Sequence, residues 1–149
     1  MAERNQERQE DRLIMKLIDS NILIYAAQPQ YPDLKELLLS NNAAVSNISR
    51  LEVLSWPKIT NDEVDFFNAI FSVIRIMEVD NEVINEAIII RKNKMMKVGD
   101  AIIGATALLY SFELITRNVE EIKHLKIGIS GLITGPLILI MKTKRKLLK

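Results

Sequence analysis

Short apolar runs alternate along the chain with longer segments in which apolar residues recur every three or four positions. The short runs are typical of buried strands, and the periodic segments are typical of helices. They predict strands at 13–18, 43–46, 76–79 and 112–115. Between them they predict helices at 20–27, 34–39, 49–56, 60–75, 80–91 and 99–110.

Capping residues support several of these helix boundaries. Thr60 and Glu63 have the spacing of a capping box, in which each side chain accepts a hydrogen bond from the backbone amide of the other residue. Asp33, Ser49 and Asp80 stand directly before other periodic segments. Aspartate and serine are favoured caps, because their side-chain oxygens accept bonds from the free amides of a first helical turn. We therefore predict that these helices start at the caps.

The order of elements predicts the fold class. Strands that are separated by helices pair in parallel, and short apolar strands without alternation are covered by helices on both faces. We expect an α/β fold with three layers, α/β/α, around a central parallel sheet of four or five strands. The domain should span residues 13–135. The polar residues 1–12 would be a disordered or frayed extension, and residues 136–149 an apolar and then basic tail.

Composition excludes several kinds of chemistry. The chain has 149 residues, 48% of them hydrophobic and 26% charged, which fits one globular domain. It has no cysteine and a single histidine, His124, so disulfides, zinc fingers and cysteine nucleophiles are excluded and a Ser–His–Asp triad is improbable. Neither GxGxxG nor GxxxxGK[ST] occurs, so the usual nucleotide-phosphate loops are absent. The net charge of +1 gives no overall attraction to nucleic acid.

Residues 127–141 form a nearly uncharged run that could be mistaken for a membrane anchor. A spanning helix needs about 20 apolar residues, and this run is shorter and interrupted by glycines and a proline. We expect one or two buried strands followed by a solvated basic tail, with contact of that tail with a membrane surface as the alternative. The first twelve residues lack the apolar core of a secretory signal, so we expect a cytoplasmic protein without a membrane partner.

Three acids lie at the ends of predicted elements: Asp19 after the first strand, Glu52 in a helix and Asp100 at a helix start. Sites in parallel sheets form beyond the carboxyl ends of the strands, so these carboxylates could meet there. Close carboxylates repel by about 4 kcal/mol per pair at an effective dielectric of 20, and a hard cation such as Mg²⁺ or Mn²⁺ relieves this. Each acid also has a simpler interpretation. Asp19 could be a helix cap, Glu52 could complete a capping box with Ser49, and Asp100 could compensate a helix dipole.

A second polar group follows the fourth strand. Thr116 could bind a metal-bound water and Arg117 a phosphate, whereas Asn118 and Glu121 could form an ordinary helix cap and capping box. A basic loop precedes Asp100. We hypothesise that its cations hold a nucleic-acid backbone beside the metal, with a solvated loop as the alternative. The loop residues concerned are Arg91, Lys92, Lys94 and Lys97.

Taken together, four segments resemble PIN-domain proteins, specifically the VapC-type ribonuclease toxins. They are Leu-Ile-Asp-Ser-Asn-Ile-Leu-Ile-Tyr at 17–25, Ser-Asn-Ile at 46–48 leading to Glu52, Asp-Ala-Ile-Ile-Gly-Ala-Thr-Ala at 100–107, and Thr-Arg-Asn at 116–118. The similarity runs in order from about residue 15 to residue 125. It implies an endoribonuclease that depends on Mg²⁺ or Mn²⁺ and hydrolyses RNA phosphodiester bonds. It also implies a homodimer that is held inactive by an antitoxin encoded beside it.

The resemblance also assigns roles to residues. Asp19, Glu52 and Asp100 would be the metal ligands, and Glu121 would stand nearest to the place of a further acid that the family commonly has. Four residues, Ser20, Asn21, Thr116 and Asn118, would support them.

Two other functions are compatible with a fold of this class. One is a catalytically weak or inactive PIN-like module that binds RNA or protein. The other, a phosphoacceptor signalling domain, is disfavoured because Asp19 is followed by Ser20 and Asn21 rather than by the second acid of the usual pair. If the protein dimerises, the amphipathic helix at 60–75 is the surface we expect it to use.

Overall fold

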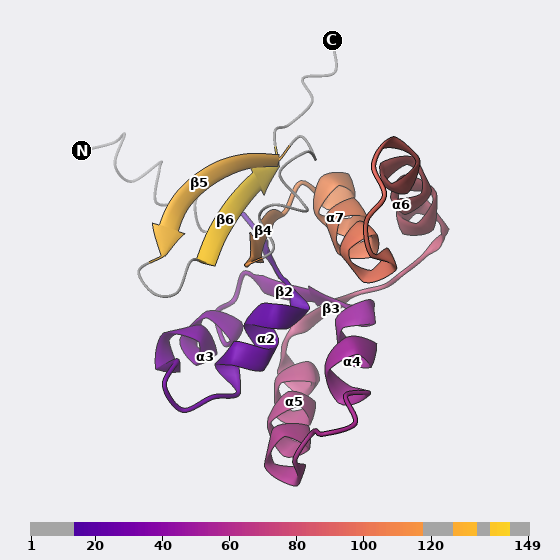
Figure 1. Cartoon of the computed structure of the whole chain (residues 1–149). Helices are drawn as coiled ribbons and strands as arrows, with labels where there is room; N and C mark the ends of the chain where they lie inside the picture. Colours follow the sequence, from indigo (N-terminus) through magenta and orange to yellow (C-terminus); the bar gives the residue numbers. More distant parts are fainter. Residues whose placement is uncertain (1–13, 118–126, 134–137, 144–149) are drawn as a thin grey trace, which may run out of the picture.

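The structure is a computed structural model that describes residues 14–117, 127–133 and 138–143 (Figure 1). Its strands are β1 (Lys16–Ile18), β2 (Ala43–Ser46), β3 (Arg75–Met77), β4 (Glu113–Thr116), β5 (Ile127–Ile133) and β6 (Ile138–Thr143). Its helices are α2 (Ser20–Ala26), α3 (Pro32–Leu38), α4 (Asn47–Leu54), α5 (Asn61–Val73), α6 (Asn81–Asn93) and α7 (Val98–Tyr110). Each helix and strand predicted before residue 117 is present, with bounds that differ by a few residues.

The strands form one sheet in the order β3-β2-β1-β4-β6-β5. The first four are parallel, and Ile18 on β1 lies opposite Ile115 on β4. β6 pairs with β4 in the antiparallel direction, and β5 pairs with β6 in the same way. The predicted parallel sheet is therefore confirmed, and an antiparallel hairpin extends it to six strands. β6 lies in the segment that we assigned to the tail.

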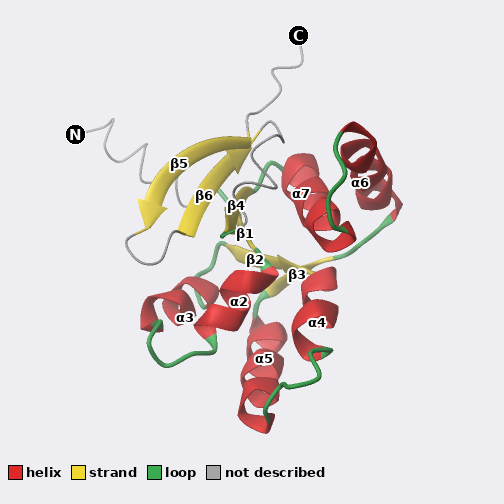
Figure 2. Cartoon of the chain, viewed as in Figure 1, coloured by secondary structure: helices red, strands yellow, loops and turns green. Residues whose placement is uncertain are grey.

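Helices cover both faces of the sheet, which gives the predicted three layers (Figure 2). Successive side chains of a strand point to opposite faces. Leu17 and Leu114 accordingly belong to the core formed with α6 and α7, whereas Ile18 and Ile115 belong to the core formed with α2, α3 and α5. The carboxyl ends of β1 and β4 are thus held between two apolar layers.

The structure confirms two of the predicted caps and corrects the other two. Thr60 and Glu63 form the capping box of α5, and Asp80 caps α6 through a bond from the Val83 amide. Asp33 instead lies inside the first turn of α3, because Pro32 supplies a backbone angle suited to a first helical residue. Ser46, and not Ser49, is the cap of α4.

The apolar face of α5 packs inside the protein. Phe67, Ile70 and Phe71 are buried in the core beneath the sheet. The amphipathic pattern that suggested α5 as a dimer surface is therefore explained by contacts within one chain.

A helix needs about 20 apolar residues to cross a lipid bilayer. In the part of the chain that the structure describes, no helix has the length and apolarity for this.

Candidate active site

Asp19 lies at the carboxyl end of β1, where it starts α2 as the N-cap residue. Its backbone amide donates to the carbonyl of Ile115 on β4 at 2.9 Å. Its side chain accepts two bonds, one from the Ser20 amide to Oδ1 at 2.7 Å and one from Thr116 Oγ1 to Oδ2 at 2.6 Å. The side chain is 3% exposed. Asp19 is therefore a helix cap and also a buried carboxylate at the sheet edge.

Burial raises the pKa of Asp19 above its ordinary value of 3.8, because the charged form loses its hydration. The bonds from Thr116 and Ser20 act in the opposite direction, because they stabilise the carboxylate. The negative charge of Glu52, which is linked to Asp19 through Ser20, raises the pKa of Asp19 further. A cation between them would favour the ionised form.

Glu52 lies on α4 with its side chain turned toward Ser20. The Ser20 hydroxyl is 2.9 Å from Glu52 Oε1 and 2.9 Å from Ser49 Oγ. A hydroxyl carries one proton, so Ser20 donates to the carboxylate when it accepts from Ser49. The predicted capping box between Ser49 and Glu52 is therefore wrong, because both side chains bond to α2 rather than to the start of α4.

Asp100 lies in the first turn of α7 and is 8% exposed. The residue before it, Gly99, lies against Glu52, since a Cβ atom on Gly99 would stand 2.8 Å from Glu52 Oε2. The start of α7 thus approaches the acid of α4 more closely than a residue with a side chain would allow. All three predicted acids are carried by segments that meet at this edge of the sheet.

The donor groups of the site are carboxylate and hydroxyl oxygens, which Mg²⁺ and Mn²⁺ prefer. Among the residues whose side chains the structure describes, no three acids, histidines or cysteines are grouped tightly enough to hold a metal ion. Ser20 links Asp19 to Glu52, and Gly99, the residue before Asp100, lies against Glu52. The oxygen donors of the site thus have the chemistry that suits a hard divalent cation.

Of the other residues predicted to support the acids, some lie at the site and some lie outside the described part of the chain. Thr116 bonds Asp19, as described above, and Asn21 lies partly buried in the first turn of α2. Asn118 and Glu121 lie outside the described residues.

Arg117 directly follows Thr116, the last residue of β4. Its guanidinium lies over the ring of Tyr25 at 4.5 Å from the ring centroid. Tyr25 in turn contacts Tyr31 edge to face, with 5.4 Å between the ring centroids. The aromatic ring therefore restrains Arg117, and its contact with a phosphate stays a prediction.

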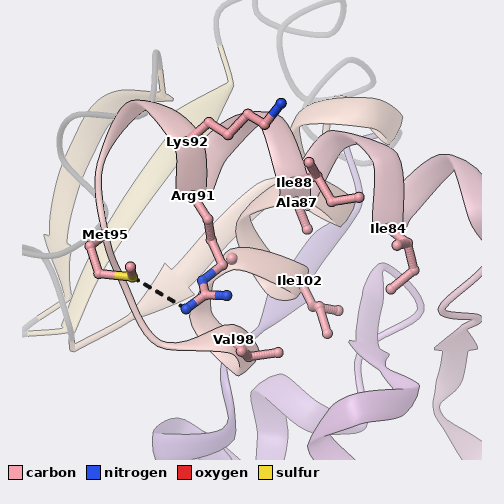
Figure 3. A pocket seen from close by; sticks show the side chains of 9 residues that line it. Ile84, Ala87, Ile88, Arg91, Lys92, Met95, Val98 and Ile102 are labelled. Carbon is pink, nitrogen blue, oxygen red and sulfur yellow. Dashed lines mark hydrogen bonds between the residues drawn. The ribbon is translucent and has the colours of Figure 1, made fainter.

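The predicted basic loop is only partly a loop: Arg91 and Lys92 lie in the last turn of α6, and Lys94 and Lys97 lie between α6 and α7. This segment adjoins an apolar groove of about 370 Å³ (Figure 3). Arg91 donates from Nε to the Met96 carbonyl at 3.0 Å and from Nη2 to Met95 Sδ at 3.2 Å. These bonds hold the loop together, so Arg91 has a structural role here. The three lysines, Lys92, Lys94 and Lys97, have exposed side chains.

Sequence reasoning did not find the roles of Ser49, Gly99 and Tyr25. Ser49 stands three residues before Glu52, so helical spacing places the two on one face, and this signal could have linked them. Gly99 and Tyr25 act through contacts with distant segments, for which the sequence carries no local signal.

Comparison with known proteins agrees with this geometry. The PIN domain family model matches residues 16–127. A chain of a toxin–antitoxin complex from Klebsiella pneumoniae is 29% identical, with a TM-score of 0.62 over 74% of this chain and 92% of that chain. No curated protein is similar enough to this chain to count as a match.

Two further solved structures share the fold. One is VapBC2 from Rickettsia felis bound to a promoter DNA fragment, with 23% identity, a TM-score of 0.62, and coverage of 74% of this chain and 92% of that chain. The other is DNA-bound VapBC from Salmonella typhimurium, with 16% identity, a TM-score of 0.63 and the same coverage. The sequence resemblance, the three-layer fold and the family model lead to one assignment. The chain belongs to the PIN domain family.

Proposed function

We propose that this protein is a metal-dependent endoribonuclease of the VapC type and the toxin of a toxin–antitoxin pair. The observation that carries the proposal is the link between buried Asp19 and Glu52 through Ser20, whose amide bonds Asp19 and whose hydroxyl bonds Glu52 at the carboxyl end of β1. Two acids held near each other at a sheet edge are costly unless they serve a cation. RNA as the substrate would place the protein in the cytoplasm.

Asp19 and Glu52, with Asp100 beside them, would hold Mg²⁺ or Mn²⁺. Such an ion supplies an activated water and neutralises charge on the phosphate. The protein's own groups set the arrangement. Thr116 fixes one oxygen of Asp19, and Ser20 fixes one oxygen of Glu52.

The RNA backbone would lie along the basic groups at the rim. Arg117 directly follows Thr116, which bonds Asp19, and the exposed Lys92, Lys94 and Lys97 precede Asp100 in the sequence. Lysine and arginine bind phosphates without regard to base sequence, and the strength of that binding falls with salt. We therefore expect RNA affinity that depends strongly on ionic strength.

The proposed protein partner is a cognate antitoxin. The 29% identical chain from Klebsiella pneumoniae belongs to a toxin–antitoxin complex, which supports a partner of this kind. We also propose a homodimer, which light scattering at micromolar concentration tests directly. A monomer at that concentration would count against it.

The decisive experiment is an RNA cleavage assay with Mn²⁺. It compares the wild type with Asp19→Asn and Asp100→Asn, and with Asp62→Asn as a control, since Asp62 is an exposed acid on α5. We expect cleavage by the wild type and the control, and a loss of at least a hundredfold in the two site variants, in the range that loss of a catalytic group produces. Equal cleavage by all four proteins would show that another site or a contaminant is responsible.

A second candidate function is an RNA-binding module with little or no catalysis. The absence of a tight three-acid group among the described side chains favours it. This candidate predicts RNA binding without cleavage and no uptake of Mn²⁺ in calorimetry. Measurable Mn²⁺ binding that is lost in Asp19→Asn would argue for the nuclease instead.

A further inference from the structure

Three flat side chains form a continuous array beside the acids. The Arg117 guanidinium lies over the Tyr25 ring, 4.5 Å from its centroid, and Tyr31 meets Tyr25 edge to face at an interplanar angle of 85°. The side chains come from the end of β4, from α2 and from the segment before α3. All three are half-buried, so each is fixed by its neighbours and still reaches the surface.

The array adjoins the candidate active site. Arg117 directly follows Thr116, whose hydroxyl bonds Asp19. Tyr25 lies on the same helix that Asp19 caps, six residues further on, which corresponds to about 9 Å at the rise of an α-helix. A single-stranded RNA whose phosphate reached Asp19 would therefore have a neighbouring base within reach of Arg117.

The chemistry of the array matches an unpaired base. Proteins recognise single-stranded RNA by stacking its bases on aromatic rings and on the planes of arginine guanidinium groups. The contact with Tyr25 restrains the Arg117 guanidinium, which is half-buried and so still reaches the surface. A base that stacks there would cost little further side-chain freedom.

We propose that Arg117 and Tyr25 form a base-stacking subsite for the nucleotide beside the scissile phosphate. The inference rests on the proposed RNA substrate. It adds to the proposed site two residues that would position the RNA strand. It also gives Arg117 a different role from a simple phosphate contact, because stacking uses the plane of the guanidinium as well as its charge.

Two other cation–π pairs in the described part of the chain supply a comparison. Lys35 lies over Phe66 at 5.6 Å, and Arg50 lies over Phe71 at 6.0 Å. Both tie a neighbouring helix to α5 and are longer than the Arg117–Tyr25 contact. Lys35→Met removes such a pair on helices that carry no predicted site residue, so it is a matched control.

The test measures RNA binding by fluorescence anisotropy in EDTA, where metal-dependent cleavage is blocked. One probe is a labelled single-stranded oligoribonucleotide, and the other has the same length but abasic residues. Arg117→Lys keeps the charge and loses the plane, and Tyr25→Leu removes the ring beneath it. We expect both variants to lose affinity for the normal probe by roughly 5- to 150-fold, the range for one stacked base. Their affinity for the abasic probe, and both affinities of Lys35→Met, should match the wild type.

An equal loss on both probes would show that Arg117 contacts only phosphate, and would overturn the proposal. Unchanged affinity in Arg117→Lys, or a wild type that binds the two probes alike, would overturn it as well. Thermal unfolding establishes that each variant is folded. If Tyr25→Leu does not fold, the binding of Arg117→Lys alone tests the proposal. Base-dependent binding without cleavage in Mn²⁺ would refute the nuclease and leave the subsite standing. Cleavage with unaltered binding by the variants would refute the subsite alone.

Discussion

Replacing Gly99 with alanine should separate the activity of the protein from its stability. Gly99 is the second residue of α7, and an added Cβ would lie 2.8 Å from Glu52 Oε2, 3.1 Å from Cδ and 3.2 Å from Oε1. Ordinary van der Waals contacts begin at 3.4 Å, so the nearest oxygen must retreat by about 0.6 Å, the difference between 3.4 and 2.8 Å. The carboxylate of Glu52 would then leave its place beside Ser20.

The cost in stability should be small, because the atoms that must move are at the end of a flexible side chain. Loss of the Ser20–Glu52 hydrogen bond costs about 1 kcal/mol, and alanine in place of glycine in a helix gains up to about 1 kcal/mol. The free energy of unfolding should therefore change by less than about 1 kcal/mol. Catalysis is more sensitive, since a misplacement of about 1 Å can cost a hundredfold in rate. We expect kcat/KM for RNA to fall by roughly 10- to 100-fold.

The assay pairs Mn²⁺-dependent RNA cleavage with urea unfolding, and repeats the unfolding of Gly99→Ala in a Glu52→Ala background. Without the carboxylate, the alanine has nothing to displace and should show only the helix gain, so the two backgrounds should differ. Cleavage by Gly99→Ala at the wild-type rate would refute the reasoning, because the position of Glu52 would then be irrelevant to the reaction. Equal effects on stability in both backgrounds would refute the contact itself.

Three further predictions follow from the bonds of Asp19 and from the cap of α5. Thr116→Val keeps the shape of the side chain but removes the donor to Asp19 Oδ2, so urea unfolding should show a loss of about 1 to 3 kcal/mol; no loss would mean that water replaces the hydroxyl. Because the folded pKa of Asp19 is raised above 3.8, its contribution to stability is full below about pH 3.8 and is lost as the pH rises through the folded value. Asparagine cannot ionise, so in EDTA the melting temperature of Asp19→Asn should rise relative to that of the wild type between pH 4 and pH 8. A difference in melting temperature that stays constant over this range would contradict this. Thr60→Ala breaks the capping box and should cost about 1 kcal/mol with RNA cleavage unchanged, whereas a fall in cleavage would mean that α5 serves the site.

Local patterns in the sequence were sufficient to predict most of the fold. The capping box at Thr60 and Glu63 and the cap at Asp80 use side chains and amides within one turn, so the sequence contains the complete signal. The predicted capping box of Ser49 and Glu52 has the same spacing, but it does not form. The packing of α2 on α4 gives both side chains a different hydrogen-bond partner, Ser20. Tertiary hydrogen bonds of this kind leave no periodic trace in a sequence.

The candidate site was predictable in outline and not in detail. Parallel strands place their carboxyl ends at one edge, so topology explains why the segments that carry Asp19, Glu52 and Asp100 meet there. The role of these acids as metal ligands stays a prediction. The contact of Gly99 with Glu52 depends instead on how closely α7 approaches α4, which packing of the core determines. The antiparallel hairpin of β5 and β6 could be predicted as apolar strands, but its pairing with β4 is set by contacts across the sheet.

The cores on the two faces of the sheet supply the force that keeps the acids together. Each acid has a buried apolar neighbour in the sequence: Ile18 before Asp19, Val53 after Glu52 and Ala101 after Asp100. Ile18 and Val53 belong to one core and Ala101 to the other, so the site is anchored from both sides of the sheet. Repulsion between close carboxylates reaches about 4 kcal/mol at an effective dielectric of 20, comparable to the roughly 1.5 to 3 kcal/mol gained by burying each large apolar side chain. Burial of the core residues next to the acids therefore holds the backbone of all three segments in place, whether Asp19 is ionised or neutral.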